Sequence, residues 1–84
     1  MKITLKLFAS LTDYLPPQAK QGNVVEIDIA PQDCISQIIE RFALPEKMVH
    51  LVLVNGVYVD PEGRMSRTLN EGDALAIWPP IAGG

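Results

Sequence analysis

Hydrophobic and polar residues alternate along much of the chain, a period of two that is typical of β-strands with one buried face. The alternation is strictest near the start, where Ile3, Leu5 and Leu7 are separated by polar residues. A continuous apolar run in the middle of the chain ends at Asn55-Gly56, a pair that favours the tight turn of a β-hairpin. Together these patterns predict five strands, over residues 2–8, 23–29, 50–54, 57–59 and 74–78.

One amphipathic helix is predicted between the second and third strands. Its apolar residues have the i, i+3, i+4, i+7 spacing that places them on one helical face: Ile35, Ile38, Ile39 and Phe42. We predict Asp33 as the N-cap residue, and we expect Pro45 to end the helix after about ten residues.

Two longer segments show neither the alternation of a strand nor the spacing of an amphipathic helix. Residues 9–22 are interrupted by Pro16-Pro17, and residues 60–73 are polar and rich in turn-forming residues. We expect a few apolar residues within these segments to hold them against the core: Leu11, Tyr14, Leu15, Met65 and Leu69.

The resulting order, β-β-α-β-β-β, predicts an α+β fold in which one main helix packs on one face of a mixed sheet of about five strands, as in a β-grasp. The first and last strands alternate most strongly, so we place them together at the centre. The helix then covers the face made by their apolar residues: Ile3, Leu5, Leu7, Leu75 and Ile77. Residues 1–78 are expected to form this domain, and residues 79–84 a flexible reactive tail.

Composition excludes several classes of function. A chain of 84 residues suits one small domain without a deep enclosed pocket. The net charge is −3 and the basic residues are scattered, which argues against nucleic-acid binding. With Cys34 as the only cysteine and His50 as the only histidine, the chain lacks an internal disulfide and the ligands of a structural zinc site. It has no signal-peptide pattern and no apolar run near the ~20 residues of a membrane span, so we expect a cytoplasmic protein without membrane association.

The last six residues, Pro79-Pro80-Ile81-Ala82-Gly83-Gly84, do not suit a core segment. The two prolines fix an extended backbone and cannot donate hydrogen bonds to a neighbouring strand. Two glycines without side chains can thread a narrow channel and present the α-carboxylate of Gly84 for reaction. A carboxylate needs activation, typically as an acyl-adenylate, and the chain contains no phosphate-binding loop for ATP. Another protein must therefore activate Gly84, unless the diglycine is merely a frayed end.

A family resemblance is carried by three segments: residues 5–11 with Tyr14 following, residues 52–56, and residues 71–84. Its most specific part is the last, in which Gly72-Asp73 precedes the final strand and Pro-Pro-Ile-Ala-Gly-Gly follows it. These segments resemble the MoaD/ThiS family of ubiquitin-like sulfur carriers over nearly the whole chain.

The resemblance implies a ubiquitin-like β-grasp that is a non-catalytic cosubstrate and binds no cofactor itself. It implies that an adenylyltransferase of the ubiquitin-activating type uses ATP to adenylate Gly84, and that a sulfur donor protein then allows conversion to a thiocarboxylate. Pro79-Pro80 and residues 8–15 look most like the small subunit of molybdopterin synthase. In that role the tail inserts into the large subunit, and its sulfur enters the pterin precursor of the molybdenum cofactor.

Three other functions stay open. A thiamine-type carrier would deliver sulfur to a thiazole, and its co-purifying partner would be a thiazole synthase. A ubiquitin-like modifier would join Gly84 to target lysines in an isopeptide bond. An inert binding module with an incidental tail would function without Gly83-Gly84.

Six further residues are considered for docking or chemistry. Alternation sends Phe8 and Trp78 away from the helix, where they could dock a partner beside the tail or be covered by residues 9–22. Val52 or Leu53 could extend that surface, but an unbroken apolar run does not assign their face. Cys34 is a persulfide candidate, although a half-buried spacer fits its surroundings better, and His50 is interpreted as an ordinary residue at a strand edge.

Overall fold

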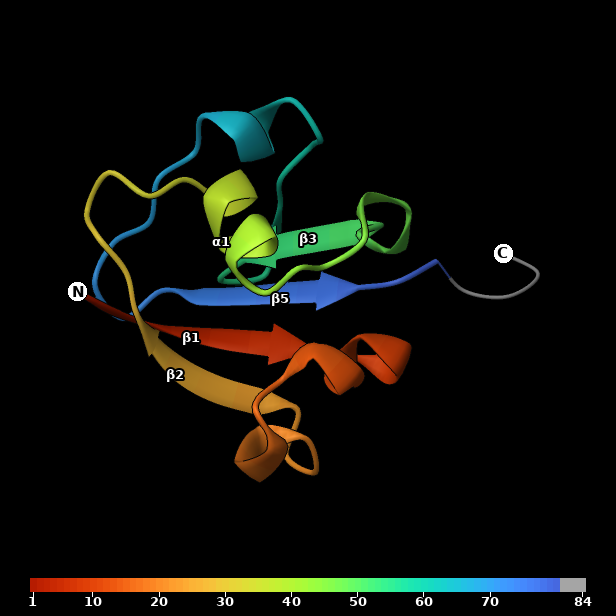
Figure 1. Ribbon diagram of the computed structural model, residues 1–84. Helices are drawn as coiled ribbons and strands as arrows, with labels where there is room; N and C mark the ends of the chain where they lie inside the picture. Colours follow the sequence, from red (N-terminus) through yellow and green to blue (C-terminus); the bar gives the residue numbers. More distant parts are fainter. Residues whose placement is uncertain (81–84) are drawn as a thin grey trace.

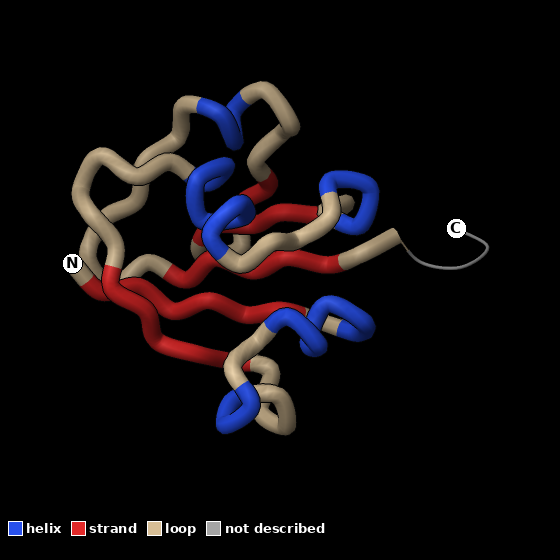
Figure 2. Tube along the Cα trace, in the orientation of Figure 1, coloured by secondary structure: helices blue, strands red, loops and turns tan. Residues whose placement is uncertain are grey.

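In a computed structural model, which describes residues 1–80, the chain forms a five-stranded sheet, one α-helix and several short 3-10 helices, labelled η (Figures 1 and 2). In chain order the elements are β1 (Lys2–Leu7), η1 (Ala9–Tyr14), η2 (Pro17–Ala19), β2 (Val24–Asp28), α1 (Ile35–Arg41), η3 (Glu46–Met48), β3 (Leu51–Val54), β4 (Val57–Tyr58), η4 (Gly63–Met65) and β5 (Ala74–Trp78).

The sheet has the strand order β2-β1-β5-β3-β4, and β1 runs parallel to β5 while the other neighbours are antiparallel. This confirms the predicted mixed sheet and its central pair, in which Leu5 lies opposite Leu75. The five strands match the predicted ranges to within one residue at each end. Asn55 and Gly56 both have positive φ angles, 50° and 83°, as the tight hairpin turn between β3 and β4 requires.

The core lies between the sheet and α1, which crosses one face of the sheet (Figure 1). All residues predicted on the covered face are buried: Ile3, Leu5, Leu7, Leu75 and Ile77. From the helix, Ile35 and Ile38 are buried while Ile39 and Phe42 are partly buried against the same cluster. The apolar residues of the helix and of the strands therefore pack into one core, as the sequence predicts.

The predicted ends of the helix are wrong. Asp33 is not the N-cap; its carboxylate accepts a hydrogen bond from the Ala30 N–H at 2.9 Å and closes the preceding turn. Cys34 takes the N-cap position, and its own N–H donates to Gln37 Oε1 at 2.8 Å. At the other end, α1 stops well before Pro45 because Ala43 has a left-handed φ of 57°.

Two of the five predicted loop anchors are also wrong. Leu11, Leu15 and Leu69 are buried as expected, but Tyr14 is 37% exposed and Met65 is 70% exposed. Met65 points outward because the residue before it in η4, Arg64, occupies the inward position.

Arg64 is 7% exposed and connects segments that are separate in the sequence. Its Nε donates to the Val59 carbonyl and its terminal nitrogen to the His50 carbonyl, both at 3.1 Å. The Arg64 carbonyl accepts from Ser36 Oγ at 2.9 Å. One residue thus joins η4 to the start of β3, the end of β4 and the first turn of α1.

Candidate functional site

The candidate tail leaves the sheet from β5, which is held on both sides to its last residue. The Phe8 N–H donates to the Ile77 carbonyl at 3.2 Å, and the His50 N–H donates to the Trp78 carbonyl at 3.0 Å. Pro79 follows and is buried, whereas Pro80 is exposed. Neither proline has an N–H to continue the ladder. The chain is therefore fixed through Pro79 and leaves the domain at Pro80.

Phe8 and Trp78 form an aromatic stack at this exit. Their ring centroids are 4.0 Å apart and their planes differ by 2°. The stack follows from the parallel register, because Leu7 lies opposite Ile77 and the next residue of each chain segment is then also adjacent. Both side chains are half-buried, so the paired rings remain partly accessible.

The face of the sheet opposite α1, here called the open face, is apolar on the side where this stack lies. Val52 is buried on the helix side, which resolves the ambiguity in the sequence. Leu53 pairs with Ala76 on the open face, next to the pair formed by Leu51 and Trp78. The other half of this face, on β1 and β2, carries charged residues, including Lys2 and Asp28, whose side-chain N and O atoms are 3.3 Å apart.

The opposite end of β5 is fixed by a hydrogen-bonded acidic residue, Asp73. Its carboxylate accepts from the Asn70 N–H at 2.8 Å and from Asn55 Nδ2 at 2.9 Å. Asn55 in turn accepts from the Ala74 N–H at 2.9 Å, so the hairpin turn is tied to the start of β5. The backbone hydrogen bond, then the Asn55 amide, and last the charge of Arg67 lower the pKa of Asp73, against an opposing effect of burial.

Asp73→Asn should lower the free energy of unfolding by about 1–2 kcal/mol at neutral pH, because an amide cannot accept both hydrogen bonds as well as a carboxylate does. The carboxylate favours its ionised form in the folded state, so its contribution is present above the unfolded pKa of about 4 and is lost as pH falls through the folded pKa. Urea unfolding between pH 2 and pH 7 should therefore show less acid destabilisation in Asp73→Asn than in the wild type. Asp13→Asn, at an exposed position, is the control; equal pH dependence in all three proteins would refute this role of Asp73.

The remaining predicted candidates, Cys34 and His50, hold structural positions. Cys34 is half-buried at the start of α1, and the backbone of His50 bonds to Trp78 and Arg64. Residues 1–80 contain no group of three or more His, Cys, Asp or Glu side chains able to hold a metal ion. Within the same range, no helix is both long and apolar enough to cross a bilayer. The predicted site residues Ile81, Ala82, Gly83 and Gly84 lie outside the described residues.

Two residues that position the site, Asp73 and Arg64, were not predicted from the sequence. For Asp73 a signal exists, since Asn55-Gly56 marks a turn and Gly72-Asp73 opens the strand, but only the register of β3 on β5 brings them together. For Arg64 the residue pattern contains no signal, because a basic residue in a polar segment is ordinarily exposed.

Comparison with known proteins identifies a family and a fold. The family model of the Mut7-C ubiquitin matches residues 1–82. A search of curated proteins finds no match. Among solved structures, SAMP1 from Haloferax volcanii is similar at 22% identity, with a TM-score of 0.69 and full coverage of both chains.

Two further solved structures share this architecture. A putative molybdopterin converting factor, subunit 1, from Pyrococcus furiosus is 21% identical with a TM-score of 0.67, over 95% of this chain and 98% of that one. A complex of subunits 1 and 2 of molybdopterin-converting factor from Helicobacter pylori matches at 16% identity and a TM-score of 0.61, with full coverage of both chains. The predicted ubiquitin-like β-grasp is thereby confirmed.

Proposed function

The chain belongs to the Mut7-C ubiquitin family, and from this premise we propose that it is a sulfur carrier that reacts through the carboxylate of Gly84. We further propose that it is the small subunit of a molybdopterin synthase. One observation carries the proposal: the central strand β5 ends at Trp78 in a partly accessible aromatic stack, and the chain that follows is buried at Pro79 and exposed at Pro80.

The proposed chemistry begins with activation of the Gly84 carboxylate by a separate adenylyltransferase. A carboxylate oxygen attacks the α-phosphorus of ATP, pyrophosphate leaves, and an acyl-adenylate forms. A persulfide sulfur of a donor protein then attacks the acyl carbon and displaces AMP, and a thiol reduces the resulting acyl disulfide to the thiocarboxylate. The absence of side chains at Gly83 and Gly84 allows both enzymes to approach the reacting carbon.

The similar structures support a large-subunit partner for this chain. The Helicobacter pylori structure is a complex of subunits 1 and 2, and the chain matches it with a ubiquitin-like fold over its whole length. In this chain the apolar half of the open face lies directly beside the tail exit. A partner that docks on Phe8, Trp78 and Leu53 would receive the tail at the same time.

Trp78→Ala should weaken binding of the partner enzymes by about 2 kcal/mol, since a central aromatic residue of an interface commonly contributes this much. Isothermal titration calorimetry with the candidate large subunit measures the change. The melting temperature should fall less than in Leu5→Ala, which opens a cavity in the core. Unchanged affinity together with a larger loss of stability than in Leu5→Ala would mean that the stack is structural and not a docking surface.

Protein modification is the second candidate function, favoured by the likeness to SAMP1, which a second solved structure describes as small archaeal modifier protein 1. In that case an amine of a target lysine displaces AMP from the same acyl-adenylate. Both functions need the same activated terminus and differ in the product, which is a free thiocarboxylate in one case and an isopeptide-linked conjugate in the other.

Intact-protein mass spectrometry on the chain purified from its own cells under reductant-free conditions tests the proposal. A fraction should carry the mass change of one oxygen replaced by sulfur, and fragmentation should locate it at Gly84. Incubation with a molybdopterin synthase large subunit and the pterin precursor should remove it. Sulfur on Cys34 would replace the mechanism with a persulfide one, discharge only by a thiazole synthase would change the pathway, and denaturant-resistant conjugates alone would favour the modifier.

A further inference from the structure

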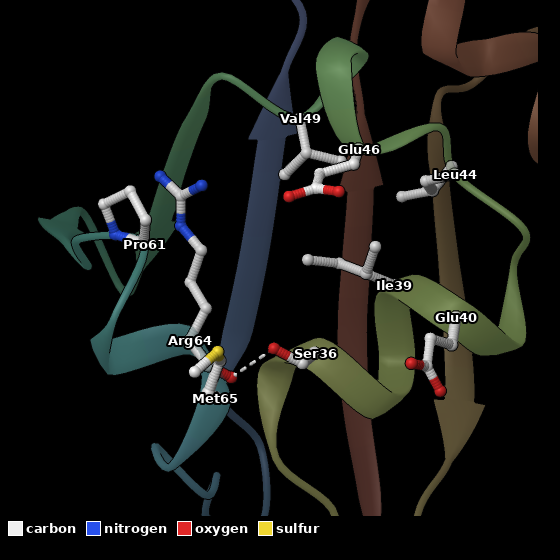
Figure 3. Close-up of a pocket in the computed structure, with 9 residues that line it drawn as sticks. All are labelled: Ser36, Ile39, Glu40, Leu44, Glu46, Val49, Pro61, Arg64 and Met65. Atoms are coloured by element: carbon white, nitrogen blue, oxygen red, sulfur yellow. Dashed lines mark hydrogen bonds between the residues drawn. The ribbon is translucent and has the colours of Figure 1, made fainter.

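A groove lies on the helix side of the sheet, opposite the open face and its aromatic stack. It is formed by α1, η3 and η4 and encloses about 410 Å³ (Figure 3). Apolar side chains from all three regions line it, among them Ile39, Leu44, Val49 and Met65. Its lining residues Val49 and Arg64 adjoin His50, which bonds to Trp78 at the end of β5, but the groove opens on the face away from the stack, and the proposed sulfur chemistry does not account for it.

One wall of the groove is rigid because it contains Arg64. The guanidinium bonds the carbonyls of Val59 and His50, and the Arg64 carbonyl accepts the Ser36 hydroxyl, a bond drawn in Figure 3. The positive charge of Arg64 is thus engaged by main-chain oxygens. A preformed wall of this kind loses little conformational entropy when a ligand binds.

The exposed charges of the groove are negative, two carboxylates against the one buried guanidinium of Arg64. Glu40 and Glu46 line it and are both exposed. Within residues 1–80 the side-chain ion pairs shorter than 4.0 Å involve Lys2, so neither of these carboxylates has such a partner. In Figure 3 the Glu46 carboxylate points into the groove beside Val49. A ligand with a positive charge would therefore be favoured over one with a negative charge.

Met65 adds an exposed apolar side chain to the edge of the groove. At 70% exposure it has the largest exposed fraction among the large hydrophobic residues of the described chain. An unbranched, polarisable methionine adapts its shape to an incoming apolar side chain and is common on binding surfaces for that reason.

We propose that this groove binds a segment of a partner protein in which an apolar side chain stands next to a lysine or arginine. The apolar side chain packs between Ile39, Val49 and Met65, and the basic group pairs with Glu46 or Glu40. Because the groove and the Phe8–Trp78 stack are on opposite faces of the sheet, one partner can hold the chain by the groove while another engages the tail.

Selection from a random peptide display library on the immobilised full chain tests this inference. The enriched peptides should combine apolar and basic residues, and a synthetic copy should bind with an affinity that falls as salt is added. The double variant Glu40→Gln, Glu46→Gln should weaken binding at least tenfold, and Met65→Ser should weaken it as well. The double variant Glu26→Gln, Asp28→Asn removes the same charge from the open face and should leave the affinity unchanged.

Chemical-shift mapping of the peptide complex locates the site directly. Shifts should concentrate at Val49, Met65 and Ile39 and should be smaller at Phe8 and Trp78 on the open face. The proposal would be overturned if the enriched peptides were acidic or if the shifts were confined to the open face. It would also be overturned if the wild-type chain enriched peptides no more than the variant Glu40→Gln, Glu46→Gln does. Self-association that is abolished by Met65→Ser would also overturn it, because the occupant would then be a second copy of this chain.

Discussion

Deletion of Gly84, or addition of one residue after it, should abolish sulfur transfer and leave the fold unchanged. The proposed chemistry takes place at a single carbon atom, so either change displaces that carbon from the reacting position in both partner enzymes. The described domain ends its hydrogen-bonded structure at Trp78, and no contact of the core is altered. Transfer should fall below detection in a reconstituted assay, while the thermal unfolding curve should coincide with that of the wild type.

A conservative change farther from the reacting carbon provides the control. Pro80→Ala keeps the length of the chain and the terminal carboxylate, and Pro80 is exposed, so transfer should persist at a reduced rate. Sulfur transfer by a chain with an added C-terminal residue would remove the basis of the carrier proposal, because that chain has no carboxylate at Gly84.

Replacement of Arg64 by methionine should lower the free energy of unfolding by about 3 kcal/mol, the largest loss that we expect from any single polar residue of this domain. The guanidinium supplies two charge-assisted hydrogen bonds, each worth roughly 1.5–3 kcal/mol, to carbonyls just before β3 and just after β4. Methionine fills much of the volume but leaves the carbonyls of Val59 and His50 without their donor. Urea unfolding at pH 7 measures the change.

Two related variants separate the hydrogen bonds from general effects of charge. Arg64→Lys keeps the charge but lacks the planar fork that reaches two carbonyls at once, so about half of the loss should remain. Arg67→Met removes a positive charge from an exposed position nearby and should change stability by less than about 0.5 kcal/mol. Equal stability of Arg64→Met and Arg67→Met would show that Arg64 does not stabilise the fold.

The sheet was predictable because its central strands carry a strong pattern. Ile3, Leu5 and Leu7 alternate without exception, and Leu75 and Ile77 repeat the pattern in the last strand. A one-residue slip of either strand would expose its whole apolar set, so the pattern also determines which side chains face the helix. The placement of Phe8 and Trp78 on the other face follows from the same alternation. Their stacking does not, since it depends on the parallel register between strands distant in sequence.

Two of the errors occur in short polar segments. Hydrophobicity alone favoured Met65 as the inward residue of its turn, yet Arg64 is buried because two unpaired carbonyls face it. Partners that come from other elements of the fold, such as those of Arg64, have no local signature in the sequence. Asp33 is a separate, local case: its residue type suits an N-cap, but its carboxylate closes a turn with Ala30, three residues earlier, and the helix starts at Cys34.

The central position of β5 has a consequence for biosynthesis. Leu5 and its parallel partner Leu75 are 70 residues apart in the chain, so the core cannot close until Leu75 has been translated. A chain interrupted before residue 74 would lack the strand that completes the sheet, and it would remain open to proteases instead of competing for partner enzymes. The strand that completes the sheet is also the one that leads directly into Pro79 and Pro80. A folded molecule has therefore been translated at least through β5, which ends at Trp78.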